Sequence, residues 1–389
     1  MLALAASFSP ANDAEVFSRL PPRHAVFVLR GTGEAYASKT ANLRRRMGRL
    51  LGPRSEHSKR LNLRERIQEI EFTPTGSEFE SQLLLYQVLR QLFPKTYSQR
   101  LRFRFAPLLK LHWANAYPRA SVTTRLSSAG GKNTYYGPFS SRSAAEKFSS
   151  AALDFFKMRR CTPDLNPDPR FPGCVYSEMK MCLAPCFKGC SDDQYRQEVS
   201  RVESFLDSRG EFLLRELSRE RDRASSELAF EEAANLHSKI EKLRPVLAQL
   251  PELVRRIDLL KAIIIQPSVA PDSVSLFPFN GCRFIGPLQF PLQSGVEARS
   301  IEARLAAAIH HLILPKPAST LERMENLALL KRWYYRSQRS GEIFLPDECG
   351  AWPWRRMVRG IGRISRGERS DQADSFSATE SPTSPSTPA

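Results

Sequence analysis

The sequence lacks a long hydrophobic run. No apolar stretch in its 389 residues approaches the roughly 20 residues that a membrane-spanning helix needs. The opening residues 1–6 are too short for the hydrophobic region of a signal peptide, and no basic segment precedes them. The seven cysteines are odd in number, which argues against a secreted disulfide framework. We therefore predict a cytoplasmic protein with no membrane partner.

Acidic side chains are scarce relative to basic ones. The chain has 58 Lys and Arg against 41 Asp and Glu, a net charge of +17, which favours a polyanionic partner. Between Arg23 and Arg66, twelve basic residues stand against three acidic ones. A solvated basic face is one interpretation. The single sign of the charge and the interleaved leucines favour contact with phosphate.

Short apolar runs and turn signals predict an α+β fold. Residues 25–29 and 35–37 flank a glycine-containing turn, a pattern typical of a β-hairpin. Apolar residues recur at helical spacing over residues 39–51, with arginines on the other face. Ser77 and Glu80 have the spacing of a capping box, which predicts a helix from there to the next proline.

Further along, residues 100–140 alternate between apolar and polar, which predicts strands, and residues 141–158 have a helical pattern. Residues 192–250 are also helical, and a break at Ala229 and Phe230 predicts an antiparallel helical hairpin. Its core is expected to come from two apolar stripes: Leu213, Leu217, Ala224 and Leu228, then Ala233, Leu236, Ile240, Leu243 and Val246.

Residues 329–336 mix aromatic and cationic side chains. Such a surface suits nucleic acid through stacking and phosphate contact. Trp333 and Tyr334 are nevertheless expected to belong to the core of a helix.

Four cysteines, Cys161, Cys174, Cys182 and Cys186, lie in one short basic segment, and Cys190 follows them. Thiols held this densely are usually metal ligands, because thiolates bind soft metals and a metal can hold together loops that lack a core. Four sulfurs without a histidine suit an iron–sulfur cluster at least as well as zinc. The alternative is a set of small buried apolar side chains or spare thiols.

The order of these features resembles the amino-terminal half of the UvrC family, over about residues 25–250. Members of that family carry a GIY-YIG nuclease module, a Cys-rich segment and a UVR helical hairpin that docks on UvrB. The residues that carry the likeness are Tyr136, Gly137, Pro138 and Phe139, the four cysteines with their neighbours, and Leu228 to Ala234 followed by Ile240 and Leu243.

The sequence pattern and the resemblance together predict six segments. These are a lead-in (1–20), a GIY-YIG-like α/β module (21–100), linking strands, a helix and the Cys-rich segment (101–195), a UVR-like helical hairpin (196–250), a mixed carboxy-terminal domain (251–365) and a disordered tail (366–389). The carboxy-terminal nuclease and helix-hairpin-helix region of the family are expected to be absent.

Hydrolysis in GIY-YIG modules uses two tyrosines, a lysine, an arginine and a glutamate that holds one divalent metal. The resemblance places Phe27 where the first tyrosine belongs and Leu85 where the metal-binding glutamate belongs. Tyr36, Lys39 and Arg46 are retained. The module is therefore expected to bind DNA but to cleave it poorly or not at all, and to use Mg²⁺ only if it is active.

The resemblance also implies binding residues. Contacts to DNA are expected from Lys39, Arg44, Arg45, Arg46 and Arg49. Contacts to a UvrB-like protein are expected from Phe230, Glu231, Ala233 and Ala234. By family analogy the four cysteines hold an iron–sulfur cluster, with zinc as the alternative.

The function predicted is that of a UvrC-like excision-repair protein with a degenerate nuclease module. One alternative is an active Cho-like enzyme that nicks DNA on the 3′ side of a lesion. A second is a non-catalytic module that binds DNA and UvrB. A third is a metal-cluster protein that binds RNA and has no role in repair.

Overall fold

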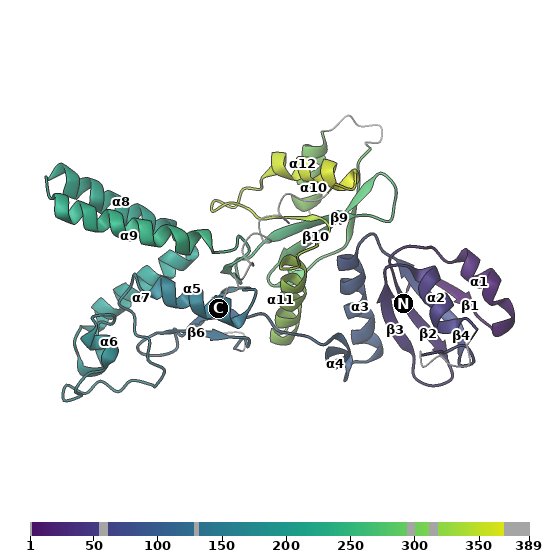
Figure 1. Ribbon diagram of the computed structural model, residues 1–389, viewed down its shortest axis with the longest axis horizontal. Coiled ribbons are helices and arrows are strands. Elements are labelled where there is room, and N and C mark those ends of the chain that lie inside the picture. Colours follow the sequence, from purple (N-terminus) through teal and green to yellow (C-terminus); the bar gives the residue numbers. More distant parts are fainter. Residues whose placement is uncertain (1, 54–60, 128–131, 294–299, 311–317, 369–389) are drawn as a thin grey trace, which may run out of the picture.

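The computed structural model describes residues 2–53, 61–127, 132–293, 300–310 and 318–368. They form a mixed structure of helices and sheets, which confirms the α+β prediction (Figure 1). The amino-terminal unit lies at one end of the elongated molecule, and a long helical hairpin projects at the other end. In the part of the chain described, no helix is both long and apolar enough to cross a membrane.

The amino-terminal unit is built on a four-stranded antiparallel sheet. Its strand order is β1 (Leu4–Ser7), β4 (Ile67–Pro74), β2 (Ala25–Gly31) and β3 (Tyr36–Thr40). Strands β2 and β3 form the predicted hairpin, with Leu29 opposite Tyr36 and Ala25 opposite Thr40. Helices α1 (Asp13–Arg19), α2 (Leu43–Leu51) and α3 (Glu78–Leu92) pack beside this sheet.

Residues in the predicted lead-in contribute directly to this unit. Strand β1 adds an edge strand to β4, and α1 follows the short 3-10 helix η1 (Pro10–Asn12) and packs on α2. Arg64 anchors the segment, because its Nη1 donates to Asp13 Oδ2 at 2.6 Å and to Leu51 O at 2.7 Å. The sheet thus begins upstream of the boundary that was predicted at residue 21.

Helix α3 begins and ends where the sequence predicted, but its cap differs in one contact. Ser77 Oγ accepts a hydrogen bond from Glu80 N at 3.1 Å, as a capping residue does. The reciprocal contact of a capping box is absent at this described cap, because Glu80 Oε2 accepts instead from Gly76 N at 2.8 Å. The helix ends one residue before Phe93, which precedes Pro94.

The middle of the chain contains a second four-stranded sheet, ordered β6 (Ala120–Thr123), β5 (Leu108–Leu111), β7 (Thr134–Gly137) and β8 (Arg255–Arg256). Helix α4 (Tyr97–Leu101) leads into it. Helices α5 (Arg142–Leu153) and α7 (Asp192–Asp207) share one hydrophobic cluster with β5 and β7. The strands and the helix predicted over residues 100–158 are therefore confirmed.

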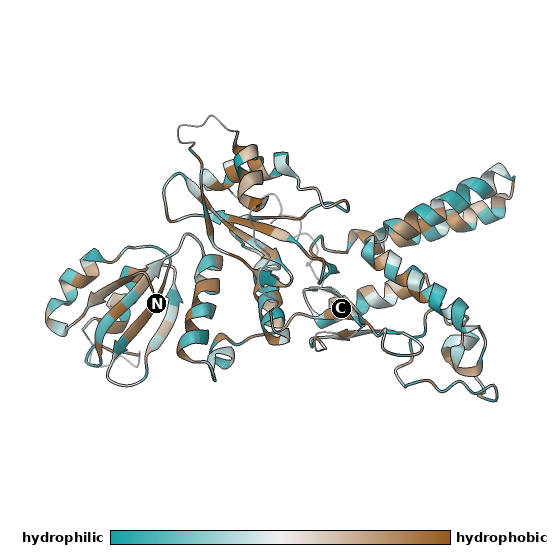
Figure 2. Ribbon diagram, turned by 180° about the vertical axis from the view of Figure 1, so that it is seen from behind, coloured by the Kyte–Doolittle hydropathy of each residue, from teal (hydrophilic) through white to brown (hydrophobic). Residues whose placement is uncertain are grey.

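Helices α8 (Glu211–Ser226) and α9 (Phe230–Ala248) form the predicted antiparallel hairpin, which projects from the body and carries much hydrophilic surface (Figures 1 and 2). Its core includes the predicted Leu213, Leu217, Leu236, Ile240 and Leu243. The prediction for Leu228 was wrong: this side chain is 72% exposed, because the residue makes the turn between the helices with a left-handed φ of 62°.

The carboxy-terminal unit contains a five-stranded antiparallel sheet. Its elements are β9 (Ala262–Pro267), β10 (Ser273–Asn280), β11 (Arg283–Phe284), β12 (Leu288–Pro291), β13 (Glu342–Phe344), α10 (Ile301–His310), α11 (Thr320–Tyr334) and α12 (Trp354–Ser365). Helices α10 and α12 cover one face of the sheet, and α11 with α3 covers the other. Trp333 and Tyr334 are buried in α11, which confirms their assignment to a helix core. The predicted tail lies outside the described residues from 369 onward.

Candidate functional site

Successive side chains of β2 point to opposite faces of the sheet and so belong to two different hydrophobic clusters. Phe27 and Leu29 belong to a cluster with Met47 of α2. Val26 and Val28 belong to the cluster that contains α3 and the carboxy-terminal sheet. We call these the α2 face and the α3 face of the amino-terminal sheet. Phe27, which the resemblance places where the first tyrosine belongs, is fully buried on the α2 face, so this position carries an unreactive ring inside a core.

Tyr36 and Arg46 meet on the α2 face. Tyr36 packs against the same cluster as Phe27, with the two ring centroids 6.1 Å apart. Arg46 Nη2 donates to Tyr36 Oη at 3.2 Å. Arg46 Nε is buried and has no hydrogen-bond partner among the described residues. The phenol of Tyr36 is thus used as an acceptor for a cation.

Lys39 is on the α3 face, opposite Val26 in the strand register. Its Nζ contacts Glu78 Oε1 at 3.1 Å, and the other carboxylate oxygen of Glu78 pairs with Arg336. Burial lowers the pKa of Lys39, while Glu78 opposes this effect. Burial of the Glu78 carboxyl raises its pKa, but the hydrogen bonds and charges of Arg336 and Lys39 outweigh burial and lower the pKa to about 2. The structure therefore separates Lys39 from Tyr36 and Arg46.

Leu85 is buried in the hydrophobic cluster shared by α3 and the carboxy-terminal unit. Its neighbour on the helix, Tyr86, donates from Oη to Glu325 Oε2 at 2.8 Å. Tyr97 donates to the other oxygen of the same carboxylate at 2.7 Å. Glu325 is fully buried and comes from α11. The helix surface where a metal-binding glutamate was sought is therefore part of an interior that joins two units.

The arginines of α2 differ in their surroundings. Arg44 is engaged locally, because its Nε donates to Leu20 O at 2.9 Å and its Nη2 donates to Ser18 O at 2.8 Å. Arg45 and Arg49 are one turn apart and exposed, and neither makes an ion pair with a described residue. Of the five predicted DNA contacts, these two are exposed and unpaired within the described part of the chain.

The cysteine segment contains little regular structure, only α6 (Val175–Glu178) and the 3-10 helix η2 (Pro185–Phe187). Arg159 is almost fully buried beside it, and its Nη1 donates to Cys161 Sγ at 3.4 Å. Burial raises the pKa of the Cys182 thiol to about 11, and the thiols of Cys161, Cys186 and Cys174 add to this rise. The other three predicted cysteines therefore lie near enough to Cys182 to affect its thiol.

The thiol chemistry of this segment fits a soft metal or an iron–sulfur cluster. All four cysteines are free and half-buried. Within the described ranges, however, no three His, Cys, Asp or Glu side chains form a group that could hold a metal ion. The donor set is thus present in one place, while its sulfur positions do not form a closed ligand shell.

The tip of the hairpin carries two large exposed apolar side chains. Phe230 is 66% exposed, and Leu228, two residues before it, is exposed as well. Glu231 and Ala234 are exposed, whereas Ala233 packs against the hairpin core. The predicted partner residues therefore include one side chain, Ala233, whose contact is within the chain itself.

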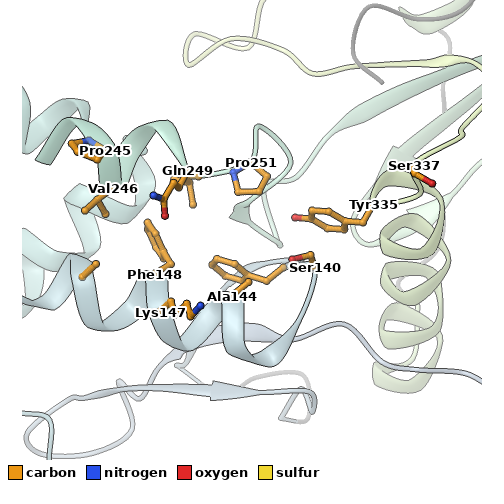
Figure 3. A pocket seen from close by; sticks show the side chains of 13 residues that line it. Ser140, Ala144, Lys147, Phe148, Pro245, Val246, Gln249, Pro251, Tyr335 and Ser337 are labelled. Carbon is orange, nitrogen blue, oxygen red and sulfur yellow. The ribbon is translucent and has the colours of Figure 1, made fainter. Parts of the chain in front are cut away.

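A cavity of about 780 Å³ lies where α5, the end of α9 and the residues after α11 meet. Phe148 and Tyr335 extend toward it (Figure 3). Tyr335 Oη donates to Pro138 O at 2.9 Å, which ties the end of α11 to the middle of the chain. Its described lining contains no carboxylate, histidine or thiol. The cavity therefore lacks the groups most often used as a general base or a metal ligand among its described lining residues.

A cleft of about 730 Å³ lies between α3 and the end of α11. Lys39, Glu78, Arg332 and Arg336 line it. Lys39 and the run of aromatic and cationic residues over 329–336 were each predicted to suit phosphate contact, but nothing in the sequence connected the two. The lysine is nearly 300 positions before the two arginines in the chain, so its proximity to them depends on the packing of the units.

The middle of the chain is similar to a known protein family. Residues 106–205 match the family model described as the UvrC/Cho excinuclease middle domain. The match includes β5 to β7, α5, the cysteine segment and most of α7.

The curated relatives are proteins named UvrABC system protein C. The one from Carboxydothermus hydrogenoformans is 29% identical over 238 residues, 60% of this chain and 39% of the relative. The relative from Rickettsia africae is 29% identical to this chain, and the match covers 54% of this chain and 32% of the relative. The relative from Bdellovibrio bacteriovorus is 28% identical, and the match covers 58% of this chain and 36% of the relative. The chain is thus UvrC-like, and it spans under two fifths of the length of these relatives. No solved structure matches it.

Proposed function

We propose that this chain is a DNA-binding component of nucleotide excision repair whose GIY-YIG-like module holds DNA without hydrolysing it efficiently. The observation that carries the proposal is the burial of Phe27 and Leu85 inside two hydrophobic clusters. A phenyl ring cannot accept a proton from water, and an aliphatic side chain cannot bind a metal. Because both positions lie in cores, no small shift of the backbone brings a reacting group to them.

The cations that remain support binding. Arg45 and Arg49 lie exposed on α2 and make no ion pair with the described residues, and the buried Nε of Arg46 has no hydrogen-bond partner among them. Charge of this kind binds phosphate without regard to sequence. The net charge of +17 favours the same partner.

Nuclease activity is tested with the purified protein, UvrA, UvrB, Mg²⁺ or Mn²⁺ and a labelled duplex that carries a lesion. We expect binding and no nick above the level of a Lys39→Ala/Arg46→Ala control. A nick on the 3′ side of the lesion that the control abolishes would show a working nuclease and overturn the proposal.

We also propose that Cys161, Cys174, Cys182 and Cys186 bind an iron–sulfur cluster or zinc. The support is their gathering around a segment with almost no regular structure, next to the buried Arg159. A metal there would hold the loops together. Metal analysis and visible absorbance of freshly purified protein test this: Cys182→Ser is expected to lose the metal and Cys349→Ser, at an exposed cysteine outside the segment, to keep it. Equal metal content in both variants would contradict the assignment.

The hairpin is proposed to dock on a UvrB-like protein through its tip. The support is the exposure of Phe230 and Leu228 at the end of a projecting element. Phe230→Ala is expected to weaken binding to purified UvrB at least tenfold, because exposed aromatic side chains are typical anchors of an interface. Leu259→Ala removes a similarly exposed apolar side chain elsewhere and is the matched control. An equal loss of UvrB binding in both variants would contradict docking through the hairpin tip.

A further inference from the structure

Two clefts meet at the junction of α3 and α11. The first, of about 730 Å³, contains Lys39 and Arg336. The second, of about 530 Å³, contains Arg102, Arg104 and Lys331. Gln82, Arg332 and Tyr335 line both clefts. The two clefts therefore form one continuous surface across the amino-terminal unit, the start of the middle region and the carboxy-terminal unit.

The charge of this surface is almost entirely positive. Glu78 is the one acidic residue among the described residues that line it. That carboxylate is already shared between Lys39 and Arg336. Four of the remaining cations, Arg102, Arg104, Lys331 and Arg332, make no ion pair within the ranges that the structure describes. Cations gathered without counter-charges repel one another, and an anionic ligand removes that repulsion.

Two further details indicate a ligand. Gln82 Nε2 is buried between the clefts and has no hydrogen-bond partner in the described part of the chain, although buried amides are normally paired. Burial and the charge of Arg104 lower the pKa of Lys331. Arg104 and Lys331 are thus close enough to interact unfavourably. A phosphate oxygen would satisfy the amide and compensate both cations.

The surface is held in a fixed arrangement. Tyr86 and Tyr97 of the amino-terminal unit both donate to the buried Glu325 of α11. These bonds and the shared hydrophobic cluster fix α3 against α11. The cations on either side are therefore positioned before a ligand arrives, which reduces the entropic cost of binding.

An aromatic side chain accompanies the cations. Phe103 lies between Arg102 and Arg104, is half-buried and lines the second cleft. Alternating cations and aromatic rings are typical of surfaces that hold a nucleic-acid strand, since the rings stack on bases while the cations contact phosphates.

We infer that the joined clefts are a DNA-strand site, distinct from the α2 arginines, in which Arg104, Lys331, Arg332 and Arg336 contact successive phosphates. Lys39 contributes to this site and not to a nuclease centre with Tyr36. Glu78 limits the affinity, because its carboxylate competes with phosphate for Lys39 and Arg336. The inference rests on the proposed DNA-binding function and names a second surface for it.

The test measures binding of fluorescently labelled single-stranded and duplex DNA by anisotropy across a salt series. Arg104→Gln/Arg332→Gln is expected to weaken binding about tenfold and to reduce the salt slope by about 1.4 for single strands, as two lost phosphate contacts do. The matched control is Arg355→Gln/Arg359→Gln, which removes the same charge from exposed positions on α12. Thermal unfolding of each variant confirms that it is folded.

Glu78→Gln is expected to change the affinity for DNA in the opposite direction. We expect it to strengthen binding severalfold, because Lys39 and Arg336 lose their competing carboxylate. Weaker binding by a folded Glu78→Gln variant would overturn the assignment of the carboxylate as a competitor.

The remaining outcomes separate the two proposals. If Arg45→Gln/Arg49→Gln weakens binding and Arg104→Gln/Arg332→Gln does not, the strand site is wrong and DNA binding by the α2 face stands. If the unaltered protein binds neither form of DNA, both proposals fail. Equal losses in the cleft and α12 variants would mean that only net charge matters, and would also overturn the site.

Discussion

The two faces of the amino-terminal sheet carry residues that were predicted to match the same nuclease motifs, yet their surroundings differ. On the α2 face, Phe27 completes a hydrophobic core and Tyr36 accepts a hydrogen bond from Arg46. On the α3 face, Lys39 opens onto a cleft whose opposite wall comes from α11. Matching a motif residue by residue therefore does not show that its members act at one site. The residues that were retained serve two surfaces.

The largest expected effect comes from placing a carboxylate on the closed part of the α3 face. Leu85→Glu is expected to lower the free energy of unfolding by about 3–5 kcal/mol, because the charge would be buried without a partner. Urea denaturation measures this loss. Leu85→Met, which conserves volume, is expected to cost less than about 1.5 kcal/mol. A stable Leu85→Glu protein that gains Mg²⁺-dependent nicking would contradict our account of this position.

The next effect concerns the contact that joins the units across the α3 face. Glu325→Gln is expected to reduce the free energy of unfolding by about 1.5–3 kcal/mol, because two tyrosines lose their charged acceptor. Guanidinium denaturation gives the value. Glu302→Gln alters an exposed glutamate of α10 and serves as the comparison. Similar midpoints for the two variants would show that the Glu325 contacts add little to the packing of the units.

A smaller effect is expected on the α2 face. Phe27→Tyr puts back the hydroxyl that the motif calls for, and we expect a loss of about 1–3 kcal/mol because the group is buried among apolar side chains. No nicking should appear, since the position of the metal ligand is still Leu85. Urea denaturation and the nicking assay together test this. An unchanged stability would mean that the α2 face is open enough to hydrate a phenol.

The smallest effect is the pH dependence that Glu78 adds. Its pKa is lowered from 4.5 to about 2 in the folded protein, so its pairs stabilise fully above pH 4.5 and lose that contribution as the pH falls toward 2. The difference in urea midpoint between the unaltered protein and Glu78→Gln should therefore shrink over this window. A constant difference from pH 7 to pH 2 would show that the carboxylate is not ionised in the ion pairs.

The sequence predicted the elements whose signals are local. The glycine turn after Leu29, the cap at Ser77 and the break at Phe230 each depend on a few neighbouring residues, and each is where it was expected. Leu228 was misplaced because spacing alone does not distinguish the last residue of a helical stripe from a turn residue with positive φ.

The candidate site was predicted less completely, for a physical reason. Phe27 and Leu85 were recognised as chemically unsuitable from their side chains alone. Strand alternation, which can be read from the sequence, already places Lys39 and Tyr36 on different faces. The residues that they contact on each face cannot be read from it. Arg336 and Glu325 reach the amino-terminal unit only through tertiary packing, and no local pattern connects residues so far apart.

The buried carboxylate of Glu325 also limits how the molecule can be divided. Its two tyrosine donors and the apolar side chains around Leu85 face the carboxy-terminal unit. A fragment that ended near residue 100 would present these groups to water, with two phenols lacking their acceptor and a broad apolar surface lacking its cover. The amino-terminal unit is therefore not expected to be stable when it is separated from the carboxy-terminal unit. Grafting it onto another protein would require transplanting α11 as well.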